Sequence, residues 1–154
     1  MNIQQPPSQA LIEKWLTAMG LNHYTCEQCT ALHISVAQGE DASLESRLFI
    51  EEWGLLLSAE FQVRPTAMML LAGELGQLNA NYPTLKLFLD IVDDAVPQLV
   101  AGATALTGAG ISADQFALFI STSLDAVAAL AGELQQMDCL YQADELPHED
   151  RQLH

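Results

Sequence analysis

The stretch that decides the fold is "LLLSAEFQVRP", Leu55 to Pro65. As far as Val63 its residues follow a period of two, which is typical of a strand. Pro65 then suits the first turn of a helix, where no backbone N–H is needed. A strand that leads directly into a helix indicates a chain that mixes both kinds of element.

The residues before this stretch predict one helix and then a meander of short antiparallel strands. Ser8 can cap a helix that runs to about Met19 and ends at Gly20. From Leu21 onward the period changes to two, most clearly between Leu32 and Val36. The polar segment "AQGEDAS" and the turn "EEWG" separate the strands, so we expect three or four of them.

The residues after the stretch predict a second helix, two strands and a third helix. The second helix runs from Pro65 to about Asn79. Pro97 belongs near the start of the later strand or on an edge, because it cannot donate to a ladder. Ser112 and Gln115 form the capping-box pattern of a long helix that ends near Met137.

These elements define the predicted fold class as α+β, an antiparallel sheet packed with helices in the order α-β-β-β(-β)-α-β-β-α. The chain of 154 residues suits a single domain with a proper core, which we place at residues 8–140. Residues 141–154 are acidic and polar, and we expect a flexible tail there.

The charge balance excludes several classes of function. Twenty acidic residues stand against five basic ones, for a formal net charge of −15. Nucleic-acid binding normally needs clustered Lys and Arg, and an anionic membrane surface attracts the same groups. Here the basic residues are scattered singly, so we expect no nucleic-acid and no membrane partner. A basic or exposed apolar protein would suit this surface. The scattered residues are Lys14, Arg47, Arg64, Lys86 and Arg151.

The cellular location follows from what the sequence lacks. No apolar run approaches the ~18–20 residues of a membrane helix. The start "MNIQQPPSQ" has neither the positive charge nor the apolar segment of a signal peptide. Three cysteines is an odd number, which argues against a secreted disulfide framework. We therefore expect a cytoplasmic protein.

The segment "HYTCEQCTALHISV" carries the candidate chemistry, with Cys26 and Cys29 in a C-x-x-C spacing and His33 four residues later. A zinc site commonly needs four ligands. Cys139 could be a third, with His33 or His23 as a fourth, but nothing in the sequence brings Cys139 near. A reversible disulfide is possible, because residues three apart in a turn lie close enough to bridge after small adjustment. The simplest interpretation is a hairpin connection whose thiols are semi-buried fillers. His33 should face outward, since Leu32 and Ile34 take the opposite phase.

The remaining motifs give no positive evidence for an enzyme. "TGAGIS", Thr107 to Ser112, echoes part of a sirtuin signature, but its continuation is absent and a strand-to-helix turn explains it. The paired acids at residues 40–41, 51–52 and 93–94 stand at predicted turns, where carboxylates are normally solvated. We predict no catalytic residues and no cofactor.

The second helix presents an unusual flank. Met69, Leu70, Gly73 and Gly76 lie off its predicted core face. Leu70 is on the far side, and the other three form a flank with little side-chain bulk. They could form a protein interface, because small residues let two backbones approach closely. Alternatively, the third helix or the sheet edge covers them within one molecule. The predicted core face is Met68, Leu71, Ala72, Leu75 and Leu78.

Four stretches together resemble the YbjN family, a family of bacterial sensory transduction regulators. They are "LIEKWLTAMGLNHYTCEQCTALHI", "AEFQVRPTAMMLLAGELGQLNA", "LKLFLDIVDDAVPQLV" and "ISADQFALFI", and they span most of residues 11–120. That family is similar in fold to the class I chaperones of type III secretion. The resemblance assigns no catalytic residue and gives Cys26 and Cys29 no role.

What the resemblance implies is a cytoplasmic, non-enzymatic regulator. Its relatives are associated with negative control of exopolysaccharide production and motility, with stress response and with virulence. A first alternative is a secretion-type chaperone, typically a homodimer, that holds an extended client segment. A second alternative is a thiol or metal sensor that uses Cys26 and Cys29.

Overall fold

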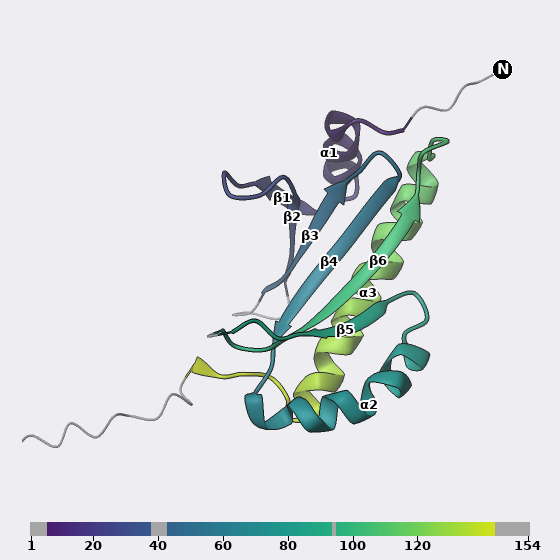
Figure 1. Ribbon diagram of the computed structural model, residues 1–154. Coiled ribbons are helices and arrows are strands. Elements are labelled where there is room, and N and C mark those ends of the chain that lie inside the picture. The colour runs from purple at the N-terminus through teal and green to yellow at the C-terminus, as the bar shows by residue number, and fades with distance from the viewer. Residues whose placement is uncertain (1–5, 38–42, 94, 144–154) are drawn as a thin grey trace, which may run out of the picture.

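A six-stranded antiparallel sheet packs one face against three helices in the computed structural model, which describes residues 6–37, 43–93 and 95–143 (Figure 1). The helices are α1 (Gln9–Ala18), α2 (Met68–Asn81) and α3 (Ala113–Gln136), and a 3-10 turn, η1 (Pro65–Ala67), precedes α2. The strands are β1 (Asn22–Thr25), β2 (Leu32–Ala37), β3 (Ser43–Ile50), β4 (Gly54–Gln62), β5 (Lys86–Asp90) and β6 (Gln98–Leu106).

The strand order in the sheet is β1-β2-β3-β4-β6-β5. The first four strands form a meander, the chain then passes through α2, and β5 returns at the far edge. β6 runs back between β4 and β5 and pairs with β4 along its whole length. The predicted α+β class and element order are confirmed, with four strands in the meander.

Local signals in the sequence set the ends of the helices. The Ser8 hydroxyl accepts from the Leu11 amide at 3.2 Å and begins α1. Gly20, with φ +72°, ends it in the left-handed conformation that glycine adopts without strain. Ser112 and Gln115 form the predicted capping box at α3. Pro65 opens only the 3-10 turn, so α2 begins three residues later than predicted.

The register of the sheet places its apolar residues on the face that meets the helices. Leu48 pairs with Leu57, and Leu57 with Ala103, and all three are buried. α3 lies along this face, and its Phe116 contacts Trp15 of α1 at a ring separation of 5.3 Å. Among the described residues no helix lies on the opposite face, which we call the open face.

One predicted core position in α2 is wrong. Ala72 is exposed, because α2 packs mainly along the line of Leu71 and Leu78. Ala72 stands at the margin of the predicted apolar face, where a periodicity argument does not separate buried from exposed positions.

The length of α3 corrects one further expectation. Its 24 residues are long and apolar enough to cross a membrane by length and composition alone, contrary to the prediction that no stretch approaches this limit. The core helix of a globular protein also passes this test, and α3 buries seven side chains in the monomer.

The described chain continues past α3 and returns to the sheet. Leu140 forms an isolated bridge with Val63, and the Tyr141 amide donates to the Gln62 carbonyl at 3.0 Å. The predicted tail of residues 141–154 therefore begins with a residue that is hydrogen-bonded to the domain. Residues 144–154 lie outside the described part of the chain.

Candidate functional site

The predicted hairpin connection between β1 and β2 is confirmed, and it brings two thiols and an imidazole together. Cys26 Sγ and Cys29 Sγ lie 3.2 Å apart. His33 Nε2 lies 3.2 Å from Cys29 Sγ and 3.3 Å from Cys26 Sγ. The three atoms therefore form a nearly equilateral triangle, and we call these residues with Tyr24 and Glu45 the thiol cluster.

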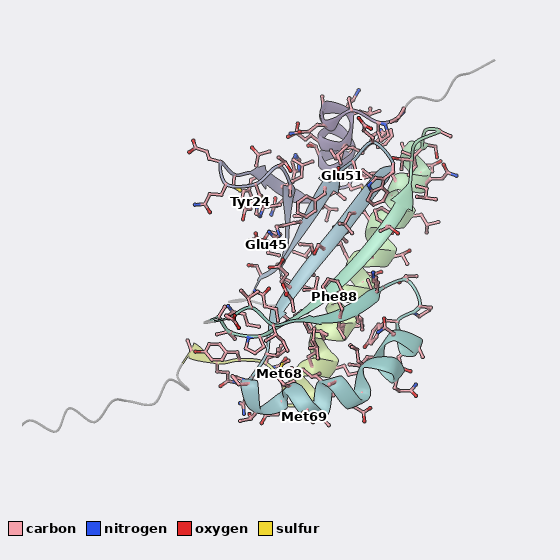
Figure 2. The ribbon with its side chains drawn as sticks, in the orientation of Figure 1. Tyr24, Glu45, Glu51, Met68, Met69 and Phe88 are labelled. Carbon is pink, nitrogen blue, oxygen red and sulfur yellow. The ribbon has the colours of Figure 1, made fainter. Side chains whose placement is uncertain are left out.

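Residues of the two neighbouring strands fix the imidazole of His33 through its Nδ1 atom and its ring face. Its Nδ1 lies 2.5 Å from Glu45 Oε1 in β3. Tyr24 in β1 donates its hydroxyl to Glu45 Oε2 at 2.9 Å and stacks on the imidazole at 4.7 Å. Figure 2 shows Tyr24 and Glu45 at the same end of the sheet. These contacts fix the position of the ring and direct its Nε2 edge toward the thiols.

The contacts in the cluster favour its charged forms. Hydrogen bonds from Cys29, the Gln28 amide and His33 lower the pKa of Cys26 to about 7. The carboxylate of Glu45 raises the pKa of His33, with the Cys26 sulfur adding to the effect. The bond to His33, followed by that to Tyr24, lowers the pKa of Glu45. These contacts therefore favour a thiolate at Cys26 near neutral pH.

The structure corrects the expected exposure of His33 and places the other two candidate ligands, Cys139 and His23, outside the ligand group of the described residues. His33 does lie on the face opposite Leu32 and Ile34, yet only 9% of it is exposed, because the cluster covers it. Cys139 is buried in the core and belongs to no ligand group among the described residues. His23 is bound instead to the Leu21 carbonyl through Nδ1, at 3.1 Å.

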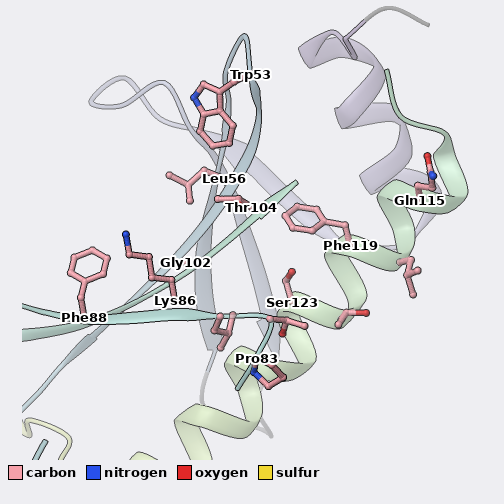
Figure 3. A pocket seen from close by; sticks show the side chains of 14 residues that line it. Trp53, Leu56, Pro83, Lys86, Phe88, Gly102, Thr104, Gln115, Phe119 and Ser123 are labelled. Carbon is pink, nitrogen blue, oxygen red and sulfur yellow. The ribbon is translucent and has the colours of Figure 1, made fainter. Parts of the chain in front are cut away.

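A second candidate region lies toward the other edge of the sheet, as a cavity of about 930 Å³ between β6 and α3 (Figure 3). We call it the edge groove. Trp53 lines it from the turn before β4, Phe88 from β5, and Leu118 and Phe119 from α3. Trp53, Phe88 and Leu118 are each more than 40% exposed, so the apolar lining is open to a partner.

The edge groove contains a free strand edge. β5 pairs with β6 only as far as Gly102, which leaves residues 103–106 without a strand partner on that side in the described chain. The amides of Val63 and Thr107 donate to Pro97 and Trp53, one at each end of the ladder between β4 and β6. Successive residues point their amides to alternate sides. It follows that Thr104 and Leu106 direct their N–H and C=O groups outward.

The flank of α2 is exposed. Met69 is 85% exposed and Leu70 is 50% exposed, and a Cβ added at Gly73 or Gly76 would meet nothing within 4 Å. Figure 2 shows Met69 on the side of α2 that faces away from the sheet. The alternative that this flank is covered within one molecule is thus wrong for the described residues. Its role as an interface stays a prediction.

The glycine motif serves the turn that the sequence suggested. Gly110 has a φ of +98°, and Ser112 caps α3 two residues later. Glu51 exchanges backbone hydrogen bonds with Gly54 across the turn before β4. Neither feature forms part of the thiol cluster, although the turn before β4 contributes Trp53 to the edge groove.

Sequence reasoning missed Glu45, Tyr24 and the whole edge groove. Tyr24 and Glu45 do stand in alternating strands, but their meeting depends on the register of three strands. The groove depends on how far β5 extends. No local pattern carries that information, although the exposed Trp53 in a polar turn is the kind of residue that marks a contact surface.

Together the fold and these regions define a small α+β protein with a thiol–imidazole cluster and an apolar groove beside a free strand edge. The chain belongs to the YbjN family, whose sequence model, described as "Putative bacterial sensory transduction regulator", matches residues 8–136. The resemblance inferred from the sequence is confirmed.

Relatives and solved structures agree with this assignment. YbjN of Escherichia coli K12 is 30% identical over 139 residues, which cover 90% of this chain and 88% of that protein, and YbjN of Shigella flexneri matches equally. The crystal structure of E. coli YbjN, "a putative transcription regulator", has a TM-score of 0.80 at 29% identity and covers 90% of this chain and 99% of that one.

A more distant structure supports the fold alone. A protein from Methanothermobacter thermautotrophicus has a TM-score of 0.56 at 17% identity over 86% of this chain and 99% of that one. The resemblance to secretion chaperones is tested by neither structure and stays a prediction.

Proposed function

We propose that this protein is a non-enzymatic, cytoplasmic regulator that acts by binding an extended segment of a partner protein in the edge groove. The observation that carries the proposal is the free edge of β6 beside an apolar lining. An extended peptide can add a strand to such an edge, with backbone hydrogen bonds for affinity and side-chain pockets for specificity.

The partner segment is expected to be apolar with basic flanks. Thr104 and Leu106 offer backbone groups to a new strand, and Trp53, Leu118 and Phe119 offer apolar contacts on either side. The formal charge of −15 attracts a basic chain and repels an acidic one. Aromatic side chains that are exposed before binding commonly supply most of the binding energy.

The decisive experiment separates the contribution of the backbone edge to partner binding from the contribution of its side chains. Thr104→Pro removes an N–H that points into the groove and lies outside the ladder with β4. Edge positions of this kind tolerate proline. The matched control is Thr104→Ala, which removes the same side chain and keeps the N–H. Circular dichroism confirms that both variants are folded.

Tagged variants are crosslinked in cells, and the captured proteins are identified by mass spectrometry against a tag-only control. We expect one partner to be captured by the wild type and by Thr104→Ala, and lost from Thr104→Pro and Leu118→Glu. Met69→Glu on α2 serves as a second control and should retain it. If that partner stays with Thr104→Pro and is lost from Met69→Glu, the α2 flank is the binding surface and the groove proposal is wrong.

The physiological part of the proposal concerns negative regulation of exopolysaccharide production and motility, together with stress response and virulence. A strain that lacks the gene should produce more exopolysaccharide and move further in soft agar. Wild type and Thr104→Ala should restore both properties, and Thr104→Pro should not. Equal complementation by all three would show that the phenotype does not depend on binding in the edge groove.

The second candidate function is a secretion-type chaperone, and the same groove favours it. The two functions differ in what happens to the client. A chaperone keeps the bound segment unfolded until it is delivered, whereas a regulator changes the activity of a folded partner. Limited proteolysis of the captured partner, with and without this protein, distinguishes them.

A further inference from the structure

The thiol cluster places three metal-ligand atoms around one point. Cys26 Sγ, Cys29 Sγ and His33 Nε2 all lie within 4.8 Å of one another, and two of the three residues are half-buried while His33 is buried. Both cysteines are free thiols. The cluster lies at the β1 end of the sheet, while β5 and β6, which border the edge groove, lie at its other end.

The contact between Nδ1 and Glu45 fixes the orientation of the His33 imidazole and its tautomer. An ionised carboxylate can only accept a hydrogen bond, so the close contact with Glu45 requires the proton of a neutral His33 to be on Nδ1. The lone pair of Nε2 then points at the two sulfurs. Metal-binding histidines commonly show this arrangement, in which a carboxylate orients the ring and increases its basicity.

We propose that Cys26, Cys29 and His33 bind a thiophilic divalent metal ion of the zinc class, with Glu45 as the positioning residue for His33 and a fourth coordination position open to solvent. Two thiolates and an imidazole are the donor set that such ions prefer. Three protein ligands with an open fourth position allow the ion to exchange or to accept a ligand from a partner.

The distances fit this proposal after a small expansion. With metal–sulfur bonds of ~2.3 Å, two sulfurs of a tetrahedral site stand ~3.8 Å apart. The sulfurs here are 3.2 Å apart, drawn together by the hydrogen bond between them. Rotation of the two side chains is sufficient to open the triangle, because both cysteines belong to the loop between β1 and β2. The thiol protons, and the Nε2 proton of a charged His33, pass to solvent when the metal binds, and no redox step is involved.

The competing possibility is that the same two thiols form a disulfide. The pair would need to move ~1 Å closer to reach the bond length of ~2.05 Å, and oxidation would need an external oxidant. Oxidation would also remove both sulfur ligands. The two outcomes exclude one another in a single molecule, so one experiment can separate them.

The first test is a titration of the full-length, reduced protein with Co²⁺ under anaerobic conditions, followed by displacement with Zn²⁺. We expect a thiolate-to-cobalt charge-transfer band and intense visible bands that saturate at a single ion per chain, and both should disappear when zinc is added. Absence of saturable thiolate bands would overturn the proposal.

Variants then assign the ligands. Cys26→Ser and Cys29→Ser should each abolish stoichiometric binding. Glu45→Gln should weaken zinc binding ~10–100-fold, as measured by competition with a coloured chelator, because it loosens the orientation of His33. His23→Gln and Cys139→Ala are the matched controls, and both should bind as the wild type does. Equal affinity of the wild type and Cys26→Ser would contradict the assignment.

Native mass spectrometry of the protein taken directly from cells completes the test. We expect the mass of the chain plus a single zinc ion in the wild type, and the bare chain in the double variant Cys26→Ser, Cys29→Ser. A mass that instead shows two hydrogens lost between Cys26 and Cys29 would identify a disulfide and overturn the metal site. Because the variants leave the edge groove intact, partner capture reports separately on the proposed function.

Discussion

At the scale of single residues, Ser46 has a polar side chain that is buried in the sheet without a hydrogen-bond partner among the described residues. It is 1% exposed, and its hydroxyl has no hydrogen-bond partner in the described structure. Its backbone neighbour across the sheet is Ile34, which is also buried. Burying an unpaired hydroxyl costs free energy that an apolar group of similar size does not cost.

We therefore expect Ser46→Ala to increase the free energy of unfolding by up to about 1 kcal/mol. Urea denaturation followed by circular dichroism measures this change. Ser58→Ala, at a half-exposed position in β4, is the control and should change it by less than ~0.5 kcal/mol. A clear loss of stability in Ser46→Ala would mean that the hydroxyl finds a partner in solution.

Tyr82 makes the free energy of unfolding depend on pH in the alkaline range. Its hydroxyl donates to Glu133 Oε2 at 2.5 Å and so joins the end of α2 to α3. Burial, followed by the bond to Glu133, raises the pKa of Tyr82 to about 12. In the unfolded chain the pKa is the ordinary ~10. The stabilising contribution is complete below about pH 10 and is lost as the pH rises toward 12.

We expect the free energy of unfolding of the wild type to fall more steeply above about pH 10 than that of Tyr82→Phe. Urea midpoints measured at several alkaline pH values give the two slopes. In a spectroscopic titration, the wild type should also show a late tyrosine transition that the variant lacks. Parallel slopes would indicate that Tyr82 is not perturbed in solution.

At the scale of elements, α3 depends on its capping box. The Ser112 hydroxyl accepts from the Gln115 amide at 3.1 Å, and the Gln115 side chain accepts from the Ser112 amide. We expect Ser112→Ala to lower the free energy of unfolding by ~1 kcal/mol, because it removes this cap. The same experiment on Ser121→Ala, at an exposed position inside α3, should show no loss, since alanine favours a helix interior.

A loss of stability in Ser121→Ala equal to that in Ser112→Ala would show that the effect is not specific to the cap. The comparison is well matched, because both changes remove one hydroxyl from one helix. It also measures how far α3 depends on local signals, beyond the seven side chains that it buries.

At the scale of the whole molecule, the exposed flank of α2 and the high net charge act in opposite directions. Met69 and Leu70 offer apolar contacts, and Gly73 and Gly76 would allow a second helix to approach closely. Two copies of a chain with a charge of −15 repel each other. Salt screens this repulsion over a Debye length of ~8 Å at physiological ionic strength.

We expect a homodimer that forms through the α2 flank and becomes more populated as salt is added. Sedimentation velocity over a range of protein and salt concentrations measures it. Met69→Glu should shift the distribution toward the monomer and leave the free energy of unfolding within ~0.5 kcal/mol of the wild type, because the side chain is exposed. A monomer under all conditions would show that the α2 flank is not a homodimer interface.

The sequence by itself determined the order of the elements, the α+β class, the caps of α1 and α3, and the position of Cys26 and Cys29 in a hairpin. These features depend on residues close together in the chain. A capping box spans four residues, and a strand or helix period is visible within about a dozen. For the same reason the family resemblance, which rests on such stretches, was correct.

Only the tertiary structure decided which distant residues meet. Glu45 reaches His33 because β2 and β3 pair in one register, and a slip of one residue would turn its side chain to the other face. The edge groove exists because β5 ends its pairing at Gly102 while β6 continues to Leu106. Register and strand length result from packing over the whole core, so no local pattern in the sequence contains them.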